Sequence, residues 1–83
     1  MSIPKEKLYW RVRRGMLELD LMLQAFLDHD YDRSAKETQD AFIELLNYSD
    51  QDLLELLMAR SETDVQPIND VIQKIRHATR VYS

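Results

Sequence analysis

The sequence contains no cysteine, one glycine and two prolines among its 83 residues. Without cysteine, disulfide bonds, a thiolate metal site and a cysteine nucleophile are all excluded. With so little glycine, the chain has no hairpin signal such as Asn-Gly and no glycine-rich phosphate loop. No secretory signal follows the N-terminal charges, and the longest apolar run, residues 56–59, is far shorter than the roughly 20 residues of a membrane span. These absences favour a soluble, cytoplasmic, helical protein.

The net charge of −4 is unevenly distributed along the chain. Residues 1–14 carry +4, residues 15–70 carry −11 and residues 71–83 carry +3. A nucleic-acid-binding module normally has a strong net basic footprint, which the acidic middle does not provide. We therefore expect no nucleic-acid partner, and binding through the basic ends is kept as a third hypothesis that salt-sensitive binding would test.

Apolar residues recur at helical spacing through most of the chain. The expected helices cover residues 4–14 and 16–30, and the next three begin at Ser34, after Ser49 and at Pro67. Connections of only a few residues favour antiparallel packing of neighbouring helices. The fold class predicted is therefore all-α, a compact bundle of five short helices forming a single domain over residues 1–83.

The second expected helix has the strongest apolar face. Its arc comprises Met16, Leu19, Met22, Leu23, Phe26 and Leu27, with Asp20, Gln24 and Asp28 opposite. Leu17 and Leu21 widen the apolar surface, which predicts that this helix is contacted from more than one side. Ser34 and Glu37 have capping-box spacing at the third helix, and Ser49 is a suitable cap for the fourth. The fifth carries Ile68, Val71, Ile72 and Ile75 at i, i+3, i+4, i+7 spacing.

Glu18 is out of place on the second helix, because it falls at the edge of the apolar arc rather than on the polar side. An acid in the first turn is stabilised by the helix dipole, which explains it without a function. The alternative is that Arg14, Gly15 and Glu18 form one exposed constellation. In it the glycine lets a partner backbone approach closely, and the flanking charges orient that partner.

Other candidate sites are weaker. Three aspartates surround His29, at positions 28, 30 and 32, but a calcium loop would need glycine where Arg33 stands and glutamate where Gln39 stands. We expect a solvated helix terminus there and no metal. His77 lies near a helix C-terminus among basic residues, which suits the dipole. Trp10, beside Arg11 on a short helix, has the composition of a binding hot spot as well as of a core residue.

A family resemblance joins these observations. Residues 14–18, Arg-Gly-Met-Leu-Glu, match the R-G-x-x-E signature of the SdhE family of succinate dehydrogenase flavinylation factors. Residues 9–13 precede the motif much as in that family, and His29-Asp30-Tyr31-Asp32 resembles its H-E-Y-D turn. The resemblance covers about residues 8 to 76. The chain departs from it at residues 54–56, where an aromatic is frequent, and at Ser61, where a glycine is frequent.

The resemblance implies a bacterial cytoplasmic assembly factor that is not itself an enzyme. Such proteins bind the flavoprotein subunit of succinate dehydrogenase, and in bacteria also that of fumarate reductase, and promote covalent attachment of FAD to it. It implies no stably held cofactor, no metal, no nucleic acid, no membrane insertion and a monomer when free. The client-binding residues implied are Arg14, Gly15, Glu18, Tyr31, Asp32, Trp10 and Arg11.

On this interpretation, Arg14, Gly15 and Glu18 should be exposed together, near Tyr31 and Asp32. The alternative function is a generic helical adaptor or regulator of protein–protein contacts without a flavin role.

Overall fold

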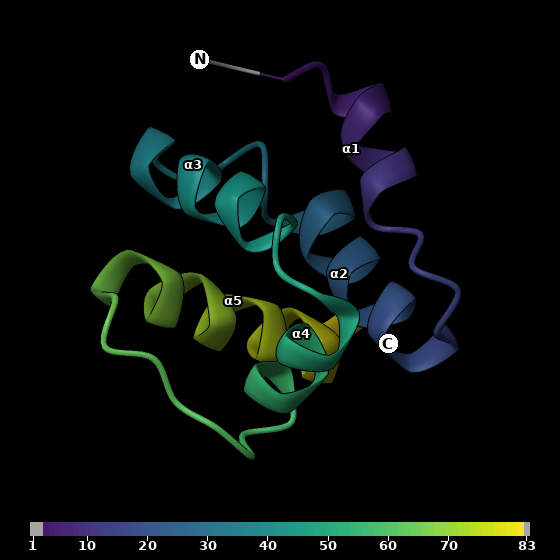
Figure 1. The fold of residues 1–83 in the computed structure, drawn as a ribbon. Coiled ribbons are helices and arrows are strands. Elements are labelled where there is room, and N and C mark those ends of the chain that lie inside the picture. The colour runs from purple at the N-terminus through teal and green to yellow at the C-terminus, as the bar shows by residue number, and fades with distance from the viewer. Residues whose placement is uncertain (1–2, 83) are drawn as a thin grey trace.

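Five helices and no strand make up the secondary structure of residues 3–82, the part of the chain that the computed structural model describes (Figure 1). The helices are α1 (Lys5–Arg11), α2 (Leu17–His29), α3 (Lys36–Leu45), α4 (Asp50–Leu57) and α5 (Gln66–Tyr82). The predicted all-α class is confirmed. The first two helices are shorter than expected, and residues 12–16 form a non-helical connection between them.

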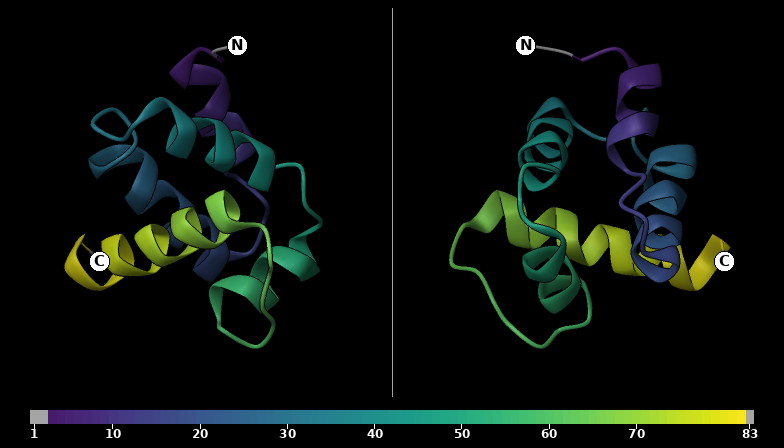
Figure 2. Two further views of the ribbon diagram at one scale, coloured as in Figure 1. Left: turned by 90° about the vertical axis from the view of Figure 1, so that its left-hand side faces the viewer. Right: turned by 45° about the vertical axis from the view of Figure 1, so that its right-hand side comes forward.

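The long helix α5 organises the bundle. It packs against α2 and α3 and less extensively against α4, and two turned views show it crossing the other helices (Figure 2). Its buried face contains Ile68, Val71, Ile72, Ile75 and Ala78. The first four are the residues that the spacing predicted, because a 3.6-residue period aligns them on one side of the helix.

All five helices contribute side chains to one hydrophobic core. Phe26 of α2 and Phe42 of α3 are fully buried, and their ring centroids lie 4.9 Å apart. The predicted arc of α2 is buried, with Met16 packed against its edge. Both α1 and α5 contact α2, but the side chains that suggested a second contact face, Leu17 and Leu21, remain 77% and 53% exposed within residues 3–82.

Helix α1 lies antiparallel to α2 and is fastened to it by polar contacts. Lys5 Nζ forms an ion pair with Asp32 at 2.8 Å, just beyond the end of α2. One turn further along α1, the Tyr9 hydroxyl donates a hydrogen bond to the Asp28 carboxylate. This bond is the main reason that the pKa of Tyr9 is raised to about 12, because ionisation would remove the donated proton. Helix α1 therefore lies beside the C-terminal part of α2.

The helix ends follow the sequence only in part. Ser49 caps α4 as predicted, and its side chain accepts the Asp52 N–H at 3.1 Å. The predicted capping box at α3 is wrong, because the N-cap is Ala35 and the Ser34 hydroxyl donates instead to the Asp30 carbonyl at 2.7 Å. The preceding turn is tight enough for Ser34 to reach back to α2.

Helix α4 ends in a left-handed residue, Ala59, with φ of 59°. Ala59 N–H donates to the Leu56 carbonyl at 3.2 Å and Arg60 N–H to the Glu55 carbonyl at 2.8 Å. These two bonds form a Schellman motif, in which the left-handed position is usually glycine.

Candidate functional site

Arg14 fastens the α1–α2 connection to the opposite part of the bundle. Its guanidinium donates a hydrogen bond to the Leu46 carbonyl, just after α3, and lies 3.5 Å from the Asp50 carboxylate at the start of α4. The side chain is only 18% exposed, and Nε is buried without a hydrogen-bond partner among residues 3–82. The expectation that Arg14 is exposed is therefore wrong. The planar fork of an arginine suits a carbonyl and a carboxylate that lie side by side.

Asp20 shapes the same connection from the other side. Its carboxylate accepts the backbone N–H of Arg14 at 2.8 Å and that of Gly15 at 3.3 Å. The sequence pattern placed Asp20 on the solvated side of α2, but the side chain folds back over the first turn of the helix. Backbone amides in a turn that interrupts helical hydrogen bonding need such an acceptor. Asp20 thus holds the turn that presents Gly15.

Gly15 and Glu18 are the exposed members of the motif. Gly15 has φ of +82°, a conformation that favours glycine, and a methyl group added to it would meet no atom of the described chain within 4 Å beyond its two neighbours in sequence. Glu18 is exposed in the first turn of α2 and makes no ion pair or hydrogen bond within residues 3–82. We call these two residues the contact patch. Open space and an unpaired charge make this surface accessible to another molecule.

Trp10 and Arg11 differ in what they offer to a partner. Trp10 is 73% exposed and is not part of the core, and the Arg13 guanidinium lies 5.4 Å from the centroid of its ring. Arg11 is half-buried and donates a hydrogen bond to the Asn47 side chain, in the α3–α4 connection. The exposed indole is thus available at the surface, whereas Arg11 is engaged within the fold.

Tyr31 and Asp32 lie at the other end of α2. A helix of 13 residues is roughly 20 Å long, which separates them from the contact patch. Tyr31 is 7% exposed and packs on Phe42 with ring centroids 5.7 Å apart, and burial is the main reason that its pKa is raised. Asp32 is engaged with Lys5. The expectation that these two residues adjoin Gly15 and Glu18 is wrong, because the intervening residues form one continuous helix.

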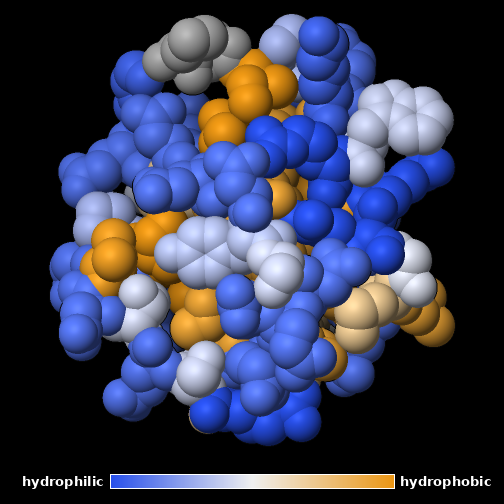
Figure 3. Space-filling view, in the orientation of Figure 1, coloured by the Kyte–Doolittle hydropathy of each residue, from blue (hydrophilic) through white to orange (hydrophobic). Residues whose placement is uncertain are grey.

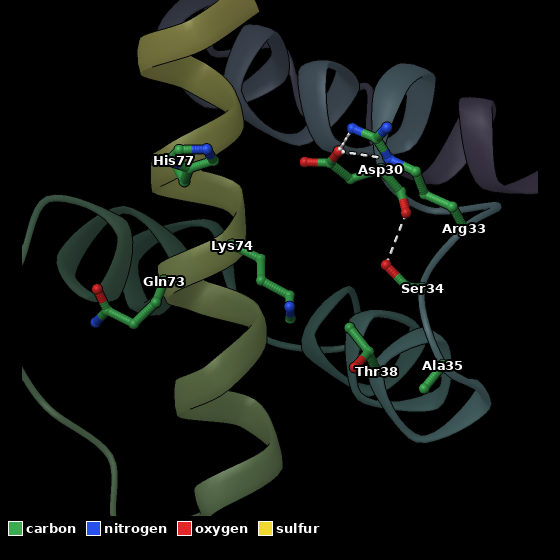
Figure 4. A pocket seen from close by; sticks show the side chains of 8 residues that line it. All are labelled: Asp30, Arg33, Ser34, Ala35, Thr38, Gln73, Lys74 and His77. Carbon is green, nitrogen blue, oxygen red and sulfur yellow. Dashed lines mark hydrogen bonds and ion pairs between the residues drawn. The ribbon is translucent and has the colours of Figure 1, made fainter.

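A wide, open cleft lies elsewhere, between α5 and the α2–α3 turn (Figure 4). It measures about 580 Å³ and is lined by Asp30, Arg33, Ser34, Ala35, Thr38, Gln73, Lys74 and His77. Arg33 is already engaged, because its guanidinium contacts the Asp30 carboxylate at 2.7 Å. Lys74 and His77 are exposed on α5. The lining combines opposite charges on an open surface, and its residues do not converge on one enclosed point.

His29 is engaged in an aromatic contact. Its ring stacks on Tyr82 with centroids 4.0 Å apart and an angle of 14° between the planes. Among residues 3–82, no group of three or more histidine or acidic side chains is arranged to hold a metal ion. Over the same residues, every helix is too short or too polar to cross a membrane.

Comparison with known proteins identifies the family. A family model described as "Flavinator of succinate dehydrogenase" matches residues 6–79. The chain belongs to this family. Among relatives named FAD assembly factor SdhE, that of a Serratia species is 36% identical over 72 residues, covering 87% of this chain and 82% of the relative. That of Legionella pneumophila strain Paris is 38% identical over 73 residues, covering 88% and 91%.

A third relative, the FAD assembly factor SdhE of Pectobacterium atrosepticum, is 41% identical over 58 residues, covering 70% of this chain and 66% of the relative. The predicted resemblance to the SdhE family is thus confirmed over most of the chain. The family is thus described as a flavinator of succinate dehydrogenase, and these relatives are named FAD assembly factors.

The residues that hold the contact patch in place in this member of the flavinator family were not predicted from the sequence. Asp20 was assigned to the solvated side of the second helix, Asp50 was interpreted as an acid suited to the dipole of the fourth, and the Leu46 carbonyl carries no signal in the sequence. Glu18 and Asp20 are both acids in the first turn of α2, where either suits the helix dipole, so residue type alone did not separate their roles. One of them binds the turn and the other is left exposed.

Proposed function

We propose that this protein is an assembly factor that binds the flavoprotein subunit of succinate dehydrogenase and promotes covalent attachment of FAD to it. The observation that carries the proposal is the contact patch, which belongs to the R-G-x-x-E motif of the family. Gly15 is open on its outer side, and Glu18 keeps an unpaired charge beside it. The same binding would extend to the flavoprotein subunit of fumarate reductase. The flavin is then a substrate attached to the client, in the cytoplasm, and no cofactor resides in the factor.

The factor acts by differential binding to client conformations. A protein that binds one conformation more tightly shifts the population towards it, by no more than the difference in affinity. The client conformation favoured would be the one in which the flavin and its acceptor histidine are juxtaposed. Bond formation is then the work of the client, and the factor contributes through contact with Gly15 and Glu18.

The test measures covalent flavin fluorescence of the client flavoprotein in cells that lack the factor and carry one of its variants. Gly15→Arg fills the open space, and Glu18→Ala removes the unpaired charge. We expect both to lower covalent flavin strongly while the variants stay folded, because both positions are exposed. Full flavinylation with both variants would refute the proposal.

Two matched controls separate contact from stability. Gly15→Ala carries the same backbone strain as Gly15→Arg without the bulk, so it should retain most flavinylation. Glu62→Ala removes an exposed glutamate from the α4–α5 loop and should be silent. Co-purification of a different protein, with no flavoprotein, would favour the generic adaptor instead.

A further inference from the structure

The outer face of α2 carries large apolar side chains that the fold leaves uncovered. Leu17 and Leu21 are 77% and 53% exposed, and because they are four residues apart they lie on one face of the helix. We call this pair the α2 stripe. In Figure 3, hydrophobic atoms reach the surface at the lower right, beside the start of α2, on a face where hydrophilic residues predominate.

A shallow hollow continues the stripe. It measures about 180 Å³ and is lined by Leu21, Gln24, Ala25, Asp28, His29 and Tyr82. The half-buried Ala25 leaves room in it, and the stacked rings of His29 and Tyr82 form one wall. The stripe and the hollow therefore meet at Leu21, and the hollow combines apolar Leu21 and Ala25 with the polar side chains of Gln24 and Asp28. Exposed apolar residues scattered singly would need no explanation, whereas Leu17 and Leu21 adjoin a hollow.

The contact patch cannot form a stable interface alone. A specific interface uses about 800 Å² and roughly 20 to 30 residues from each partner, whereas Gly15 has no side chain and Glu18 supplies one carboxylate. Leu17 precedes Glu18 in sequence, and Leu21 lies one turn further along the same helix. Any partner seated on the patch and of ordinary size therefore reaches the stripe.

The charges along α2 show the character of that partner. The helix has three carboxylates within its bounds, and two of them are engaged: Asp20 with the turn amides and Asp28 with the Tyr9 hydroxyl. Glu18 is left with an uncompensated charge beside the α2 stripe. A complementary surface is apolar with a basic group at its edge, since charged partners across interfaces are matched in sign.

We propose that the α2 stripe and its hollow are part of the surface that binds the succinate dehydrogenase flavoprotein. An apolar side chain of the client seats on Leu17 and Leu21, a second enters the hollow, and a basic residue faces Glu18. This inference rests on the proposed function and adds two binding residues to it. A few well-packed, desolvated side chains, surrounded by contacts that exclude water, carry most of the affinity of an interface.

The test compares affinities of purified variants for the purified flavoprotein subunit of the same organism, by isothermal titration calorimetry. Leu17→Ser and Leu21→Ser should each weaken binding about tenfold, and the double variant more. Leu17→Met retains an apolar side chain of similar volume and should bind like the wild type. The matched control is Val65→Ser, since Val65 is half-exposed but lies before α5, remote from the stripe. Thermal unfolding should change little in all five variants.

The outcomes separate this inference from the proposed function. Normal affinity of the double variant, together with lost affinity of Glu18→Ala, would overturn the inference and leave the proposed function standing. No binding of the flavoprotein by the wild type would overturn both. A second copy of this chain is the competing occupant of the stripe, and analytical sedimentation tests for it. If the protein self-associates and Leu17→Ser abolishes the self-association, the stripe is a dimer contact and the inference is overturned.

Discussion

Asp20 accepts the backbone N–H of Arg14 at 2.8 Å, so the arginine is held through its main chain as well as its side chain. The guanidinium meanwhile reaches the Leu46 carbonyl and the Asp50 carboxylate on the far side of the connection. Asp20 and Arg14 thus hold the turn in place, whereas Gly15 and Glu18 are exposed on it. The first two predictions below test the holding residues.

Asp20→Ala should destabilise the protein by about 1–2 kcal/mol, because two turn amides lose a charged acceptor. Asp20→Asn keeps one carbonyl oxygen and should lose less. Urea unfolding measures both, and Asp52→Ala is the control, since it removes an exposed first-turn acid from α4. If Asp20 holds the displayed turn, Asp20→Ala also weakens client binding in native buffer, where the variant is still folded. Unchanged stability and binding would contradict this role.

Arg14→Lys should cost about 2 kcal/mol of unfolding free energy, nearly as much as Arg14→Ala. A lysine cannot offer the planar fork that reaches both Leu46 and Asp50. A double-mutant cycle with Asp50→Ala apportions the cost. Because the Asp50 side chain is 44% exposed, we expect a coupling below about 1 kcal/mol, with most of the loss due to the unpaired Leu46 carbonyl. A coupling energy as large as the whole loss of unfolding free energy would show instead that the ion pair between Arg14 and Asp50 holds the connection.

Gly15→Ala should destabilise by about 1 kcal/mol, and Gly15→Asn by less. The cost comes from the positive φ and not from crowding, because the added methyl group meets nothing within 4 Å in the described chain beyond its two neighbours in sequence. Asparagine adopts this conformation more readily than alanine. Thermal unfolding of the two variants checks the order. Equal losses would indicate that the turn relaxes to another conformation when substituted.

Alkaline pH should weaken the protein through Tyr9. The pKa of Tyr9 is about 12 in the fold, against about 10 for a free side chain. Its contribution is fully present below pH 10, where the hydroxyl is protonated in both states, and is lost as the pH rises towards 12. Urea unfolding between pH 9 and 12 should therefore show a shallower loss in Tyr9→Phe than in the wild type. Tyr31, whose pKa is also raised, is common to both proteins, so parallel losses would contradict the role of Tyr9.

Local periodicity was enough to predict the helices and most of the core. The face of α5 and the arc of α2 follow from spacing, because a buried helix side must repeat every 3.6 residues. The partner of Arg14 could not be predicted in this way. Its long side chain reaches a carbonyl whose position depends on how α3 and α4 pack, and that is set by contacts far apart in sequence.

Whether each aromatic side chain is buried or exposed also could not be predicted from local sequence patterns. Tyr31 follows the same helix as Phe26 and is drawn into the core by Phe42, whereas Trp10 stays outside because α1 turns its Leu8 inward instead. The motif predicted where an exposed patch begins, at Gly15 and Glu18. Its assigned neighbours Tyr31 and Asp32 were misplaced, because the length of α2 keeps them apart.

The chain uses its only glycine at residue 15 and closes α4 with Ala59 in the same left-handed region, at a cost of about 1 kcal/mol. For an eight-residue helix that ends in a strained residue, we expect a low free energy of local unfolding. We expect the amides of Ala59 and Arg60 to exchange with deuterium sooner than those of α2 or α5, and Ala59→Gly to slow them. Local unfolding of this protein should therefore begin at the α4–α5 loop, while the turn at Gly15, which Asp20 and Arg14 stabilise through hydrogen bonds, stays folded.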